Sequence, residues 1–369
     1  MSGKTNPDIR EISQEEIGQF FLLHGEKRFR ATQVYEWLWK KSCRSFDEMT
    51  NLPQVTRQLM RDHFSFHAAV SAIRQTSSDG TVKTGFRLFD GLLVEGVLIP
   101  SRERSTVCIS SQVGCAMNCS FCLTGTMGFA RNLTPAEMVN QVCAVRDFLL
   151  AEPAENLIGP REVTNLVFMG MGEPLNNLDN LLTALSILTE PKGLDFTGRK
   201  VTVSTCGIAP KLKKLGENST VNLAISLHAV DDATRDQLMP VNTRYPLDVL
   251  LEACRTYPMP KRRRIMFEYI LLKGINDSDE QAYELARKLH KIPCKINLLP
   301  YNESPLLPYR SPTPERVLAF QKILLDKHFS VFIRTSRGSD ISAACEPGVM
   351  RITLAFSATG ATESVSAEP

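Results

Sequence analysis

The amino-acid sequence predicts an α/β fold: a partial (β/α)6 barrel with a small helical N-terminal accessory domain and a short β-hairpin extension. Two observations predict it. Residues 9–64 read as amphipathic helices, whereas from residue 106 onward short apolar strands alternate with helical segments. Strands separated by helices favour a parallel sheet or barrel. In such folds ligands bind at the carboxyl ends of the strands, so functional residues are expected there.

The accessory domain is expected over residues 1–70. Aromatic and apolar residues such as Trp37, Leu38 and Phe46 mark its amphipathic stretches, and Asn51-Leu52-Pro53 interrupts them. The alternation that is typical of strands first appears near Thr84. We therefore expect only helices before that point.

The hairpin extension is expected over residues 71–104. Its strands are predicted at Thr84–Phe89 and Leu92–Ile99, because Asp90-Gly91 between them is typical of a tight turn.

The barrel is expected over residues 105–345, followed by a small, polar and partly disordered tail at 346–369. Its first long helix begins at Thr134-Pro135-Ala136-Glu137, which offers an N-cap, a proline at the first position and a glutamate at the third. The candidate strands are Thr106–Ser110, Asn165–Met169, Lys200–Thr205, Val221–His228, Ile265–Leu272, Lys295–Leu299 and Val331–Thr335.

Composition says more about the compartment than about partners. The 369-residue chain has a formal net charge of only +3, and its local basic clusters, such as Lys261-Arg262-Arg263-Arg264, are read most simply as solvated faces. The polar start, Met1 to Glu15, lacks the apolar core of a signal peptide, and no apolar run is long enough for a membrane span. Its ten cysteines are therefore expected in a reducing cytoplasm, as metal ligands, reactive groups or core filler.

The most informative feature is the segment from Cys115 to Cys122, in which Cys115, Cys119 and Cys122 have C-x3-C-x2-C spacing. This spacing differs from the paired C-x2-C hooks of a zinc ribbon. Three buried cysteines brought together by chance are the simpler alternative, but free cysteines usually scatter rather than share one loop. A [4Fe–4S] cluster usually takes four thiolates, so three would leave one iron open to another ligand.

The cysteine loop in this setting resembles the radical S-adenosylmethionine (SAM) superfamily. The resemblance implies a full or partial (β/α) barrel and one [4Fe–4S] cluster, whose open iron is chelated by SAM. Reduction of SAM then yields a 5′-deoxyadenosyl radical. Gly170-Met171-Gly172-Glu173-Pro174, one strand and helix later, resembles the segment that receives the methionyl amino group, although alone it could be a plain turn.

Further motifs resemble the RlmN family, whose members methylate C2 of adenine in 23S rRNA and in tRNA. These motifs are Cys108–Cys115, the Gly-Met-Gly-Glu-Pro turn, Ser226-Leu227-His228, Met239-Pro240-Val241-Asn242 and Ala343-Ala344-Cys345. The match runs from about residue 25 to residue 345, and the helical N-terminal stretch resembles the family's accessory domain. The related Cfr family methylates C8 and usually has Ala after Gly-Glu, so Pro174 favours the C2 enzyme.

The resemblance implies roles for three residues outside the cluster loop. Cys345 would become S-methylcysteine by displacement from one SAM, and a second SAM would supply the radical, so two are used per turnover. The carbon radical adds to C2 and forms a transient covalent protein–RNA adduct. Glu95 would then take the C2 proton, and Cys108 would release the protein through a transient disulfide with Cys345. Position alone would favour an outward strand residue for Glu95 and a buried cysteine for Cys108.

The resemblance also implies SAM contacts at Gly172, Glu173, Ser204, Ser226, Leu227, His228 and Asn302. Most of these fall at carboxyl ends of predicted strands, as the barrel rule expects. Without the resemblance each would be read as a polar cap or turn residue. Apolar neighbours on the hairpin are expected to raise the pKa of Glu95 toward a useful range.

One departure concerns the segment after Cys345, where Glu346-Pro347-Gly348 replaces the family's usual Gly-Gln-Leu. Proline restricts the residue before it, which bears on loop mobility.

Three functions are weighed: adenine-C2 methylation, Cfr-type C8 methylation, and an RNA-binding iron–sulfur protein without methyl transfer. The expected partners are 23S rRNA, tRNA and an electron donor such as flavodoxin. A monomer is expected.

Overall fold

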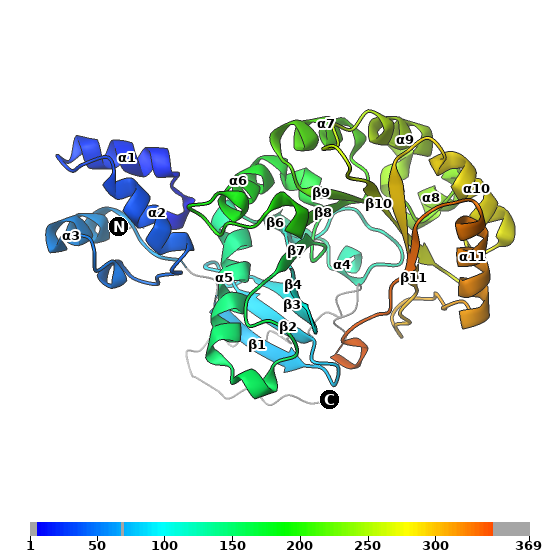
Figure 1. Ribbon diagram of the computed structural model, residues 1–369, viewed down its shortest axis with the longest axis horizontal. Coiled ribbons are helices and arrows are strands. Elements are labelled where there is room, and N and C mark those ends of the chain that lie inside the picture. Colours follow the sequence, from blue (N-terminus) through cyan, green and yellow to red (C-terminus); the bar gives the residue numbers. More distant parts are fainter. Residues whose placement is uncertain (1–5, 68–69, 342–369) are drawn as a thin grey trace.

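The computed structural model describes residues 6–67 and 70–341, so Cys345 and the predicted tail lie outside the described residues. Figure 1 shows a small helical domain beside one large curved sheet that is wrapped by helices. Among the described helices, none combines the length and the apolar character needed to cross a bilayer.

The accessory domain contains three helices, α1 (Gln14–Leu23), α2 (Arg30–Trp39) and α3 (Gln54–His63), with 3-10 turns at Ile9–Glu11 and Phe46–Glu48. Ser13 and Glu16 form a capping box that starts α1. The apolar faces of the helices meet in a core that includes Phe21, Leu38 and Met60, all fully buried. The prediction of helices before residue 65 is confirmed.

The sheet has ten strands in the order β1-β2-β3-β4-β7-β8-β9-β10-β11-β12. Strands β1 to β4 are antiparallel, and those from β4 to β12 are parallel, so the hairpin extension and the barrel share one sheet. The bounds are β1 Val70–Thr76, β2 Val82–Arg87, β3 Leu93–Ser101, β4 Arg104–Cys108, β7 Asn165–Phe168, β8 Val201–Thr205, β9 Asn222–Ser226, β10 Ile265–Leu271, β11 Cys294–Pro300 and β12 Val331–Ile333. The predicted partial parallel barrel is confirmed.

Two expectations about strands need correction. The sequence predicts no strand before Thr84, yet β1 precedes it; this edge strand has few apolar residues, and a register shift between Ser71 and Ile73 interrupts its period. The strand predicted to follow residue 105 begins at Arg104 and ends at Cys108, two residues earlier than expected. Cys108 is therefore the last residue of a strand.

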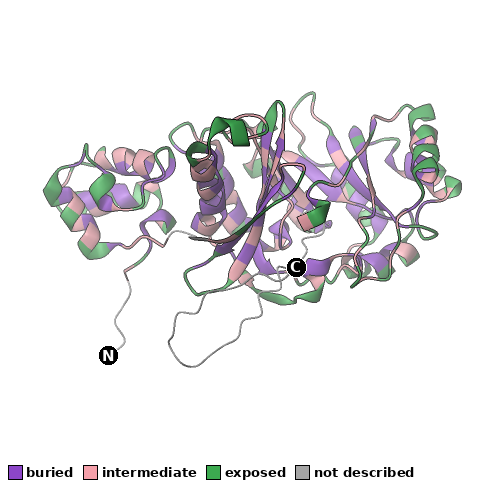
Figure 2. Cartoon of the chain, turned by 90° about the horizontal axis from the view of Figure 1, so that it is seen from below, coloured by how far each residue is buried: buried purple, intermediate pink, exposed green. Residues whose placement is uncertain are grey.

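Helices cover one face of the sheet, and buried residues gather along the strands beneath them (Figure 2). The helix α5 begins at the predicted Thr134–Glu137 capping box. The bounds are α5 Pro135–Ala151, α6 Leu178–Thr189, α7 Ala209–Asn218, α8 Asp232–Leu238, α9 Leu247–Arg255, α10 Asp279–Leu289 and α11 Pro314–Asp326, and a short α4 spans Leu123–Thr126.

The two faces of the sheet differ in chemistry. Residues that face the helices are apolar and almost fully buried: Val107, Leu166, Phe168, Val203, Leu223, Ile225, Phe267, Ile296 and Leu298. We call the opposite face the inner face. The strand register places on it Lys83, Glu95, Cys108, Thr202, Ser204, Asn222, Ser226, Glu268 and Asn297. The alternation of side chains along each strand thus gives the sheet one packing face and one polar face.

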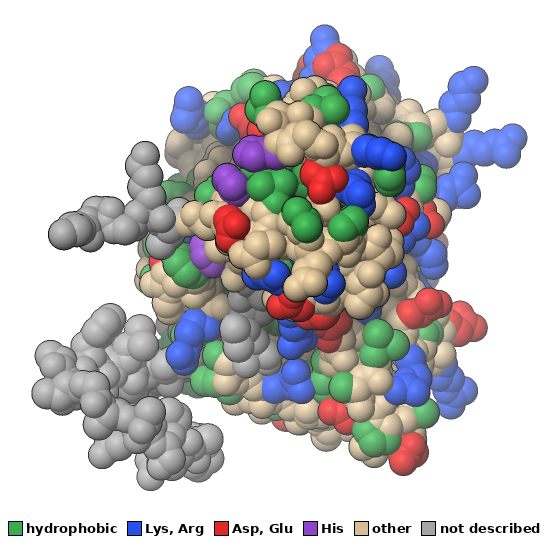
Figure 3. Space-filling model, turned by 90° about the vertical axis from the view of Figure 1, so that its left-hand side faces the viewer, with side chains coloured by type: hydrophobic (Ala, Val, Ile, Leu, Met, Phe, Trp, Pro, Cys, Tyr) green, Lys and Arg blue, Asp and Glu red, His purple; other side chains and the backbone are tan. Residues whose placement is uncertain are grey.

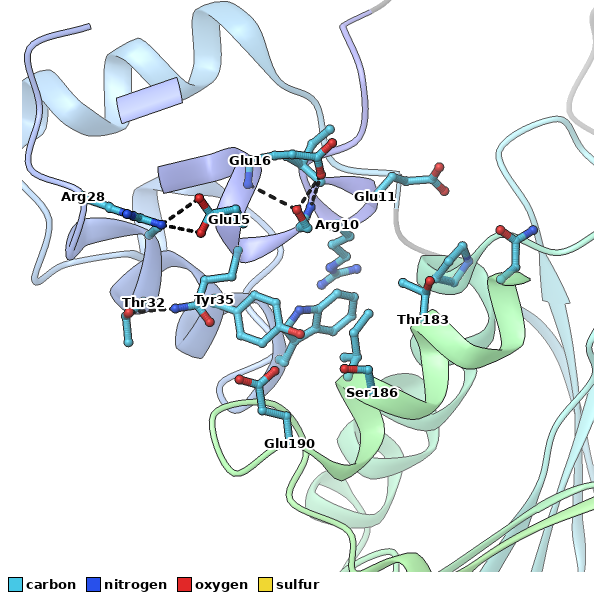
Figure 4. Close-up of a pocket in the computed structure, with 18 of the residues that line it drawn as sticks. Arg10, Glu11, Glu15, Glu16, Arg28, Thr32, Tyr35, Thr183, Ser186 and Glu190 are labelled. Atoms are coloured by element: carbon cyan, nitrogen blue, oxygen red, sulfur yellow. Dashed lines mark hydrogen bonds and ion pairs between the residues drawn. The ribbon is translucent and has the colours of Figure 1, made fainter. Parts of the chain in front are cut away.

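A buried arginine joins the accessory domain to the barrel. Arg10 is 4% exposed and donates from Nη1 to Asn140 Oδ1 on α5 at 2.8 Å and from Nη2 to the Cys43 carbonyl at 2.7 Å. Beside it lies a groove of about 950 Å³ between the two parts. Figure 4 shows Tyr35 of α2 and Glu190, which follows α6, among the residues that line it. The groove lies against α6, away from the inner face, so we assign it to the domain joint.

We predict that Arg10→Met lowers the free energy of unfolding by about 3–5 kcal/mol, because two charge-assisted hydrogen bonds are lost and their acceptors stay buried. Arg44→Met is the matched control. Arg44 also bridges the domains, to Asp147 at 2.7 Å, but its side chain is 67% exposed, so its loss should cost less than about 1 kcal/mol. Urea unfolding measures both. Equal losses in the two variants would contradict the assignment of Arg10 as the joint.

Candidate active site

The cysteine loop is held by a small hairpin of its own rather than by β4 directly. Strand β5 (Gln112–Gly114) pairs with β6 (Phe129–Asn132), and the loop from Cys115 to Cys122 lies between them, ahead of α4. Gly114 has φ +73°, and a Cβ there would lie 1.9 Å from the Gly128 carbonyl oxygen. The Cys115 N–H donates to that same oxygen at 2.8 Å. Only glycine therefore permits the closure that presents the first cysteine.

The three thiols lie in one electrostatic environment. Burial, then the charges of Cys122 and Glu173, raise the pKa of Cys115 to about 11. Burial, then Cys122 and Cys115, raise the pKa of Cys119 further. Within the described part of the chain, no three His, Cys, Asp or Glu side chains converge on a single ion. A [4Fe–4S] cluster does not need such convergence, because each thiolate binds a different iron.

The Gly170–Pro174 turn follows β7, as predicted, and packs on the cysteine segment. Gly172 has φ +98°, and a Cβ there would lie 2.4 Å from the Gln112 side chain. Gln112 Oε1 accepts the Glu173 N–H at 2.8 Å. The buried Glu173 carboxylate accepts from the Leu175 and Cys206 backbone N–H groups at 2.8 and 2.7 Å. Glu173 thus ties the ends of β7 and β8 together, and burial raises its pKa.

Arg235 on α8 is the main support of this site, and the sequence did not predict it. Its side chain is completely buried. It donates to the carbonyls of Cys206 at 2.7 Å, Ser226 at 3.1 Å and Leu227 at 3.0 Å, and to Asn242 Oδ1 at 2.9 Å. Its charge also lowers the pKa of the nearby Cys119, against the larger effect of burial. One guanidinium thus fixes the ends of β8 and β9 behind the cysteine loop.

His228 follows β9 in a left-handed conformation, with φ +60°. Its Nδ1 lies 3.0 Å from the Ile270 N–H, and its carbonyl accepts from Asn276 Nδ2 at 2.7 Å. The ring meets Phe121 of the cysteine loop edge-on, with centroids 5.0 Å apart. Burial and the charge of Arg235 lower the pKa of His228 to about 3, so the imidazole is neutral at physiological pH.

The other predicted site residues gather along the inner face and at strand ends. Glu95, Cys108, Ser204 and Ser226 are all partly exposed, and Asn302 follows β11 as expected. The remaining cysteines were expected in the core, and the structure confirms this for Cys43, Cys143, Cys206, Cys254 and Cys294.

Two inner-face residues gave no signal in the sequence. Lys83 on β2 is buried, and its Nζ lies 3.9 Å from Glu95 Oε1, so Glu95 faces a cation rather than only the apolar neighbours that were expected. Glu268 on β10 accepts from Asn297 Nδ2 at 2.9 Å, and burial raises its pKa to about 7. From the sequence, a single polar residue in an apolar strand does not indicate which residue it contacts or which face of the sheet it lies on. These contacts become visible only once the strand register is known.

The basic run from Lys261 to Arg264 precedes β10 and therefore lies at the amino ends of the parallel strands, opposite the site. This basic run is therefore not part of the site.

Comparison with known proteins decides the family. A model described as "Ribosomal RNA large subunit methyltransferase N-terminal domain" matches residues 7–65, and "Radical SAM superfamily" matches residues 109–286. A relative from Desulfotalea psychrophila, "Dual-specificity RNA methyltransferase RlmN", is 62% identical over 92% of this chain and 93% of its own length. The chain belongs to the RlmN family. The family predicted from the motifs is confirmed.

Other RlmN relatives and a solved structure agree. The protein of the same name from Geobacter sulfurreducens is 49% identical over 92% of this chain and 91% of its own. A radical SAM methyltransferase structure from Sphaerobacter thermophilus superimposes with a TM-score of 0.85 and 40% identity, over 92% of this chain and 98% of that one. Membership implies a [4Fe–4S] cluster and SAM. The donor set fits: three grouped thiols beside a buried guanidinium suit an anionic cluster.

We predict that His228→Asn flattens the acid dependence of stability. Because the folded pKa of His228 lies below its usual 6.5, the unfolded chain binds more protons between these values, and stability falls as pH drops below about 6.5. Asparagine tolerates the left-handed backbone but does not titrate. Urea unfolding of the metal-free protein at pH 7 and pH 5 should show a smaller loss in the variant. His290→Asn, on the exposed end of α10, should keep the original loss. An unchanged loss in His228→Asn would contradict the assignment.

Proposed function

We propose that this RlmN-family protein is a radical SAM methyltransferase that methylates C2 of an adenosine in 23S rRNA and in the tRNA anticodon loop. Relatives that match this chain over nearly their full length are named dual-specificity RNA methyltransferases. The observation that carries the proposal is one shared surface. The cysteine loop lies at the carboxyl end of the sheet, and Glu95 and Cys108 lie on the inner face beside it.

In this proposal Cys115, Cys119 and Cys122 hold the cluster. Gly172, Glu173, Ser204, Ser226, Leu227, His228 and Asn302 contact SAM. When bound, the cluster and SAM supply the carbon-centred radical chemistry that an unactivated ring carbon requires. The neutral imidazole of His228 would add no positive charge to a site that holds the cationic SAM. Arg235 donates hydrogen bonds to the backbone carbonyls of Ser226 and Leu227, so the Ser226 side chain stays available to contact SAM.

Cys345 is proposed as the residue that carries the methyl group as S-methylcysteine, with two SAM used per turnover. The described chain ends at Ile341, and the turn before it is fixed to the β1–β2 connection. Asp340 accepts from Ser77 Oγ at 2.5 Å and from the Ser78 N–H at 2.9 Å. The last described residues of the chain thus lie beside the connection that leads into β2, the strand that carries Lys83.

Glu95 and Cys108 are proposed to act on the covalent RNA adduct. The register pairs Cys108 with Val97, two residues along β3 from Glu95, so both side chains lie on the inner face. Glu95 would take the C2 proton. The Cys108 thiolate would attack the sulfur of Cys345, so that an S–S bond forms while the bond from that sulfur to the bridging carbon breaks. The bridging carbon would keep the electron pair and take a proton, which gives the methylated base. Such a disulfide would be transient and would need reduction after each turnover.

The accessory domain is proposed to contact RNA. Figure 3 shows its exposed end, where histidines lie beside hydrophobic side chains and basic residues are interspersed with acidic ones. Phe20, His24 and His63 form one ring cluster, with the His24 and His63 centroids 4.9 Å apart. Rings of this kind can stack on unpaired bases. The nearby Arg28 and Arg30 are paired with Glu15 and Glu26, so simple charge attraction is weaker there. We also propose a monomer and an electron donor of the flavodoxin type.

The main alternative is methylation at C8, as in the Cfr family. Pro174, which is buried in the turn after β7, favours C2, because the Cfr family usually has Ala at this position. Mass mapping of RNA from cells lacking the gene separates the two: loss of a 2-methyl mark supports the proposal, and loss of an 8-methyl mark overturns it.

We predict that Cys345→Ala abolishes methylation but leaves the reconstituted cluster and RNA binding intact, because the thiol would carry carbon rather than iron. Cys254→Ala, a buried cysteine on α9, is the control and should methylate normally. The measurement is methyl incorporation into RNA after anaerobic reconstitution, with the iron content of each variant. Methylation by Cys345→Ala would refute the thioether route. That result would not bear on the cluster ligands, which the iron content of the variants tests separately.

A further inference from the structure

The carboxylate of Glu95 has a buried charged neighbour, Lys83. Lys83 on β2 lies two positions from Gly85, which pairs directly with Glu95 on β3. Lys83 and Glu95 are therefore diagonal neighbours on the inner face, and Nζ lies 3.9 Å from Oε1. The Lys83 side chain is 2% exposed and that of Glu95 is 12% exposed. The separation is too long for a direct hydrogen bond but short enough for a strong charge interaction.

A buried ammonium is costly unless something repays its desolvation. Burial lowers the pKa of Lys83, and the negative charge of Glu95 opposes that effect. The neighbouring residues along the same row, Val97 and Cys108, offer no second carboxylate. The buried Lys83 ammonium thus lies beside a carboxylate that keeps some contact with solvent.

The backbone of Glu95 is also restrained. Its N–H points to Met171 Sδ at 3.4 Å, and its carbonyl accepts from Ser110 Oγ at 2.6 Å. Both contacts come from the loops that carry the cysteine segment and the glycine turn. The position of Glu95 is therefore linked to the cluster and SAM region, and its charge is linked to Lys83.

Among the described residues, strands β2 and β4 place charged and titratable groups on the face of the sheet that carries Glu95. Strand β2 contributes Lys83 and the exposed Arg87, and β4 contributes Cys108. The turn after β7 contributes the uncharged Met171. Arg87 lies on the same face and the same strand as Lys83 but in contact with solvent, so its charge is screened.

We propose that Lys83 is a positioning residue for Glu95: its buried ammonium keeps the carboxylate ionised and in place for the C2 proton. The inference rests on the proposed function, in which Glu95 is the base. In that step the C2–H bond breaks, its electron pair stays with the adenine ring, and the proton passes to a carboxylate oxygen. A cation 3.9 Å away favours the form of Glu95 that can accept it.

The first test is the pH dependence of adduct resolution in the reconstituted enzyme. The covalent protein–RNA species is followed on denaturing gels after single-turnover mixing at several pH values. In Lys83→Met the acid limb of the resolution rate should move up by about 1–3 pH units, with normal rates restored at high pH. Lys83→Arg, which keeps the charge, should recover most of the original profile. Arg87→Met removes an equal but screened charge and should leave the profile in place.

A second test does not need the reaction. The infrared band of the protonated Glu95 carboxyl, identified by its loss in Glu95→Gln, is titrated in the protein without RNA. In Lys83→Gln its midpoint should rise by about 1–3 pH units. An unchanged midpoint, or an adduct-resolution rate that falls equally at every pH, would overturn the positioning role. If the unmodified enzyme forms no adduct at all, the proposed function fails, while the infrared titration still decides the role of Lys83.

Discussion

The site depends on a guanidinium that never meets solvent. Arg235 donates to three backbone carbonyls at the ends of β8 and β9 and to Asn242. These hydrogen bonds hold the segments that follow the two strands in fixed positions. A cation buried this deeply needs a full set of acceptors, and each of its contacts is at the same time a restraint on the site. The cysteine loop depends on the same helix, because the Ser120 N–H donates to the Leu238 carbonyl at the end of α8. Geometry and positive charge are thus supplied together beside Cys119, where the charge of Arg235 opposes the larger effect of burial on the thiol pKa.

The second constraint is the two-faced sheet. Strands such as β8 and β9 place apolar residues against the helices and polar residues on the inner face. The packing face contributes the stability, which leaves the inner face available for chemistry. The strand pairing runs without a register shift from β2 to β11. Residues more than 100 positions apart, such as Glu95 and Ser226, therefore lie on the same face of the sheet. The fold therefore brings Glu95, Cys108 and the proposed SAM contacts to one surface.

The sequence predicts the parts of this site that are local. The cysteine spacing, the glycine turn after β7 and the polar residues at strand ends are all readable because each is set by a short segment. The helical N-terminal part and the parallel barrel follow from periodicity. What the sequence does not predict depends on partners far along the chain. Arg235 reads as a solvated helix residue until its acceptors are known, Lys83 as a surface lysine until its register is known, and β1 as a loop because its bulged edge carries little apolar pattern.

In the proposed function the cysteine loop supplies three thiolates, which leaves the fourth iron for SAM at the carboxyl ends of the strands. The most direct measurement is the electron paramagnetic resonance spectrum of the reduced, reconstituted protein before and after addition of SAM. Direct ligation to one iron predicts a clear change in the cluster signal on addition of SAM, and none with S-adenosyl compounds that lack the methionyl amino and carboxylate groups. A spectrum that is unchanged by SAM would contradict the assignment of this loop as a three-thiolate site with an open iron.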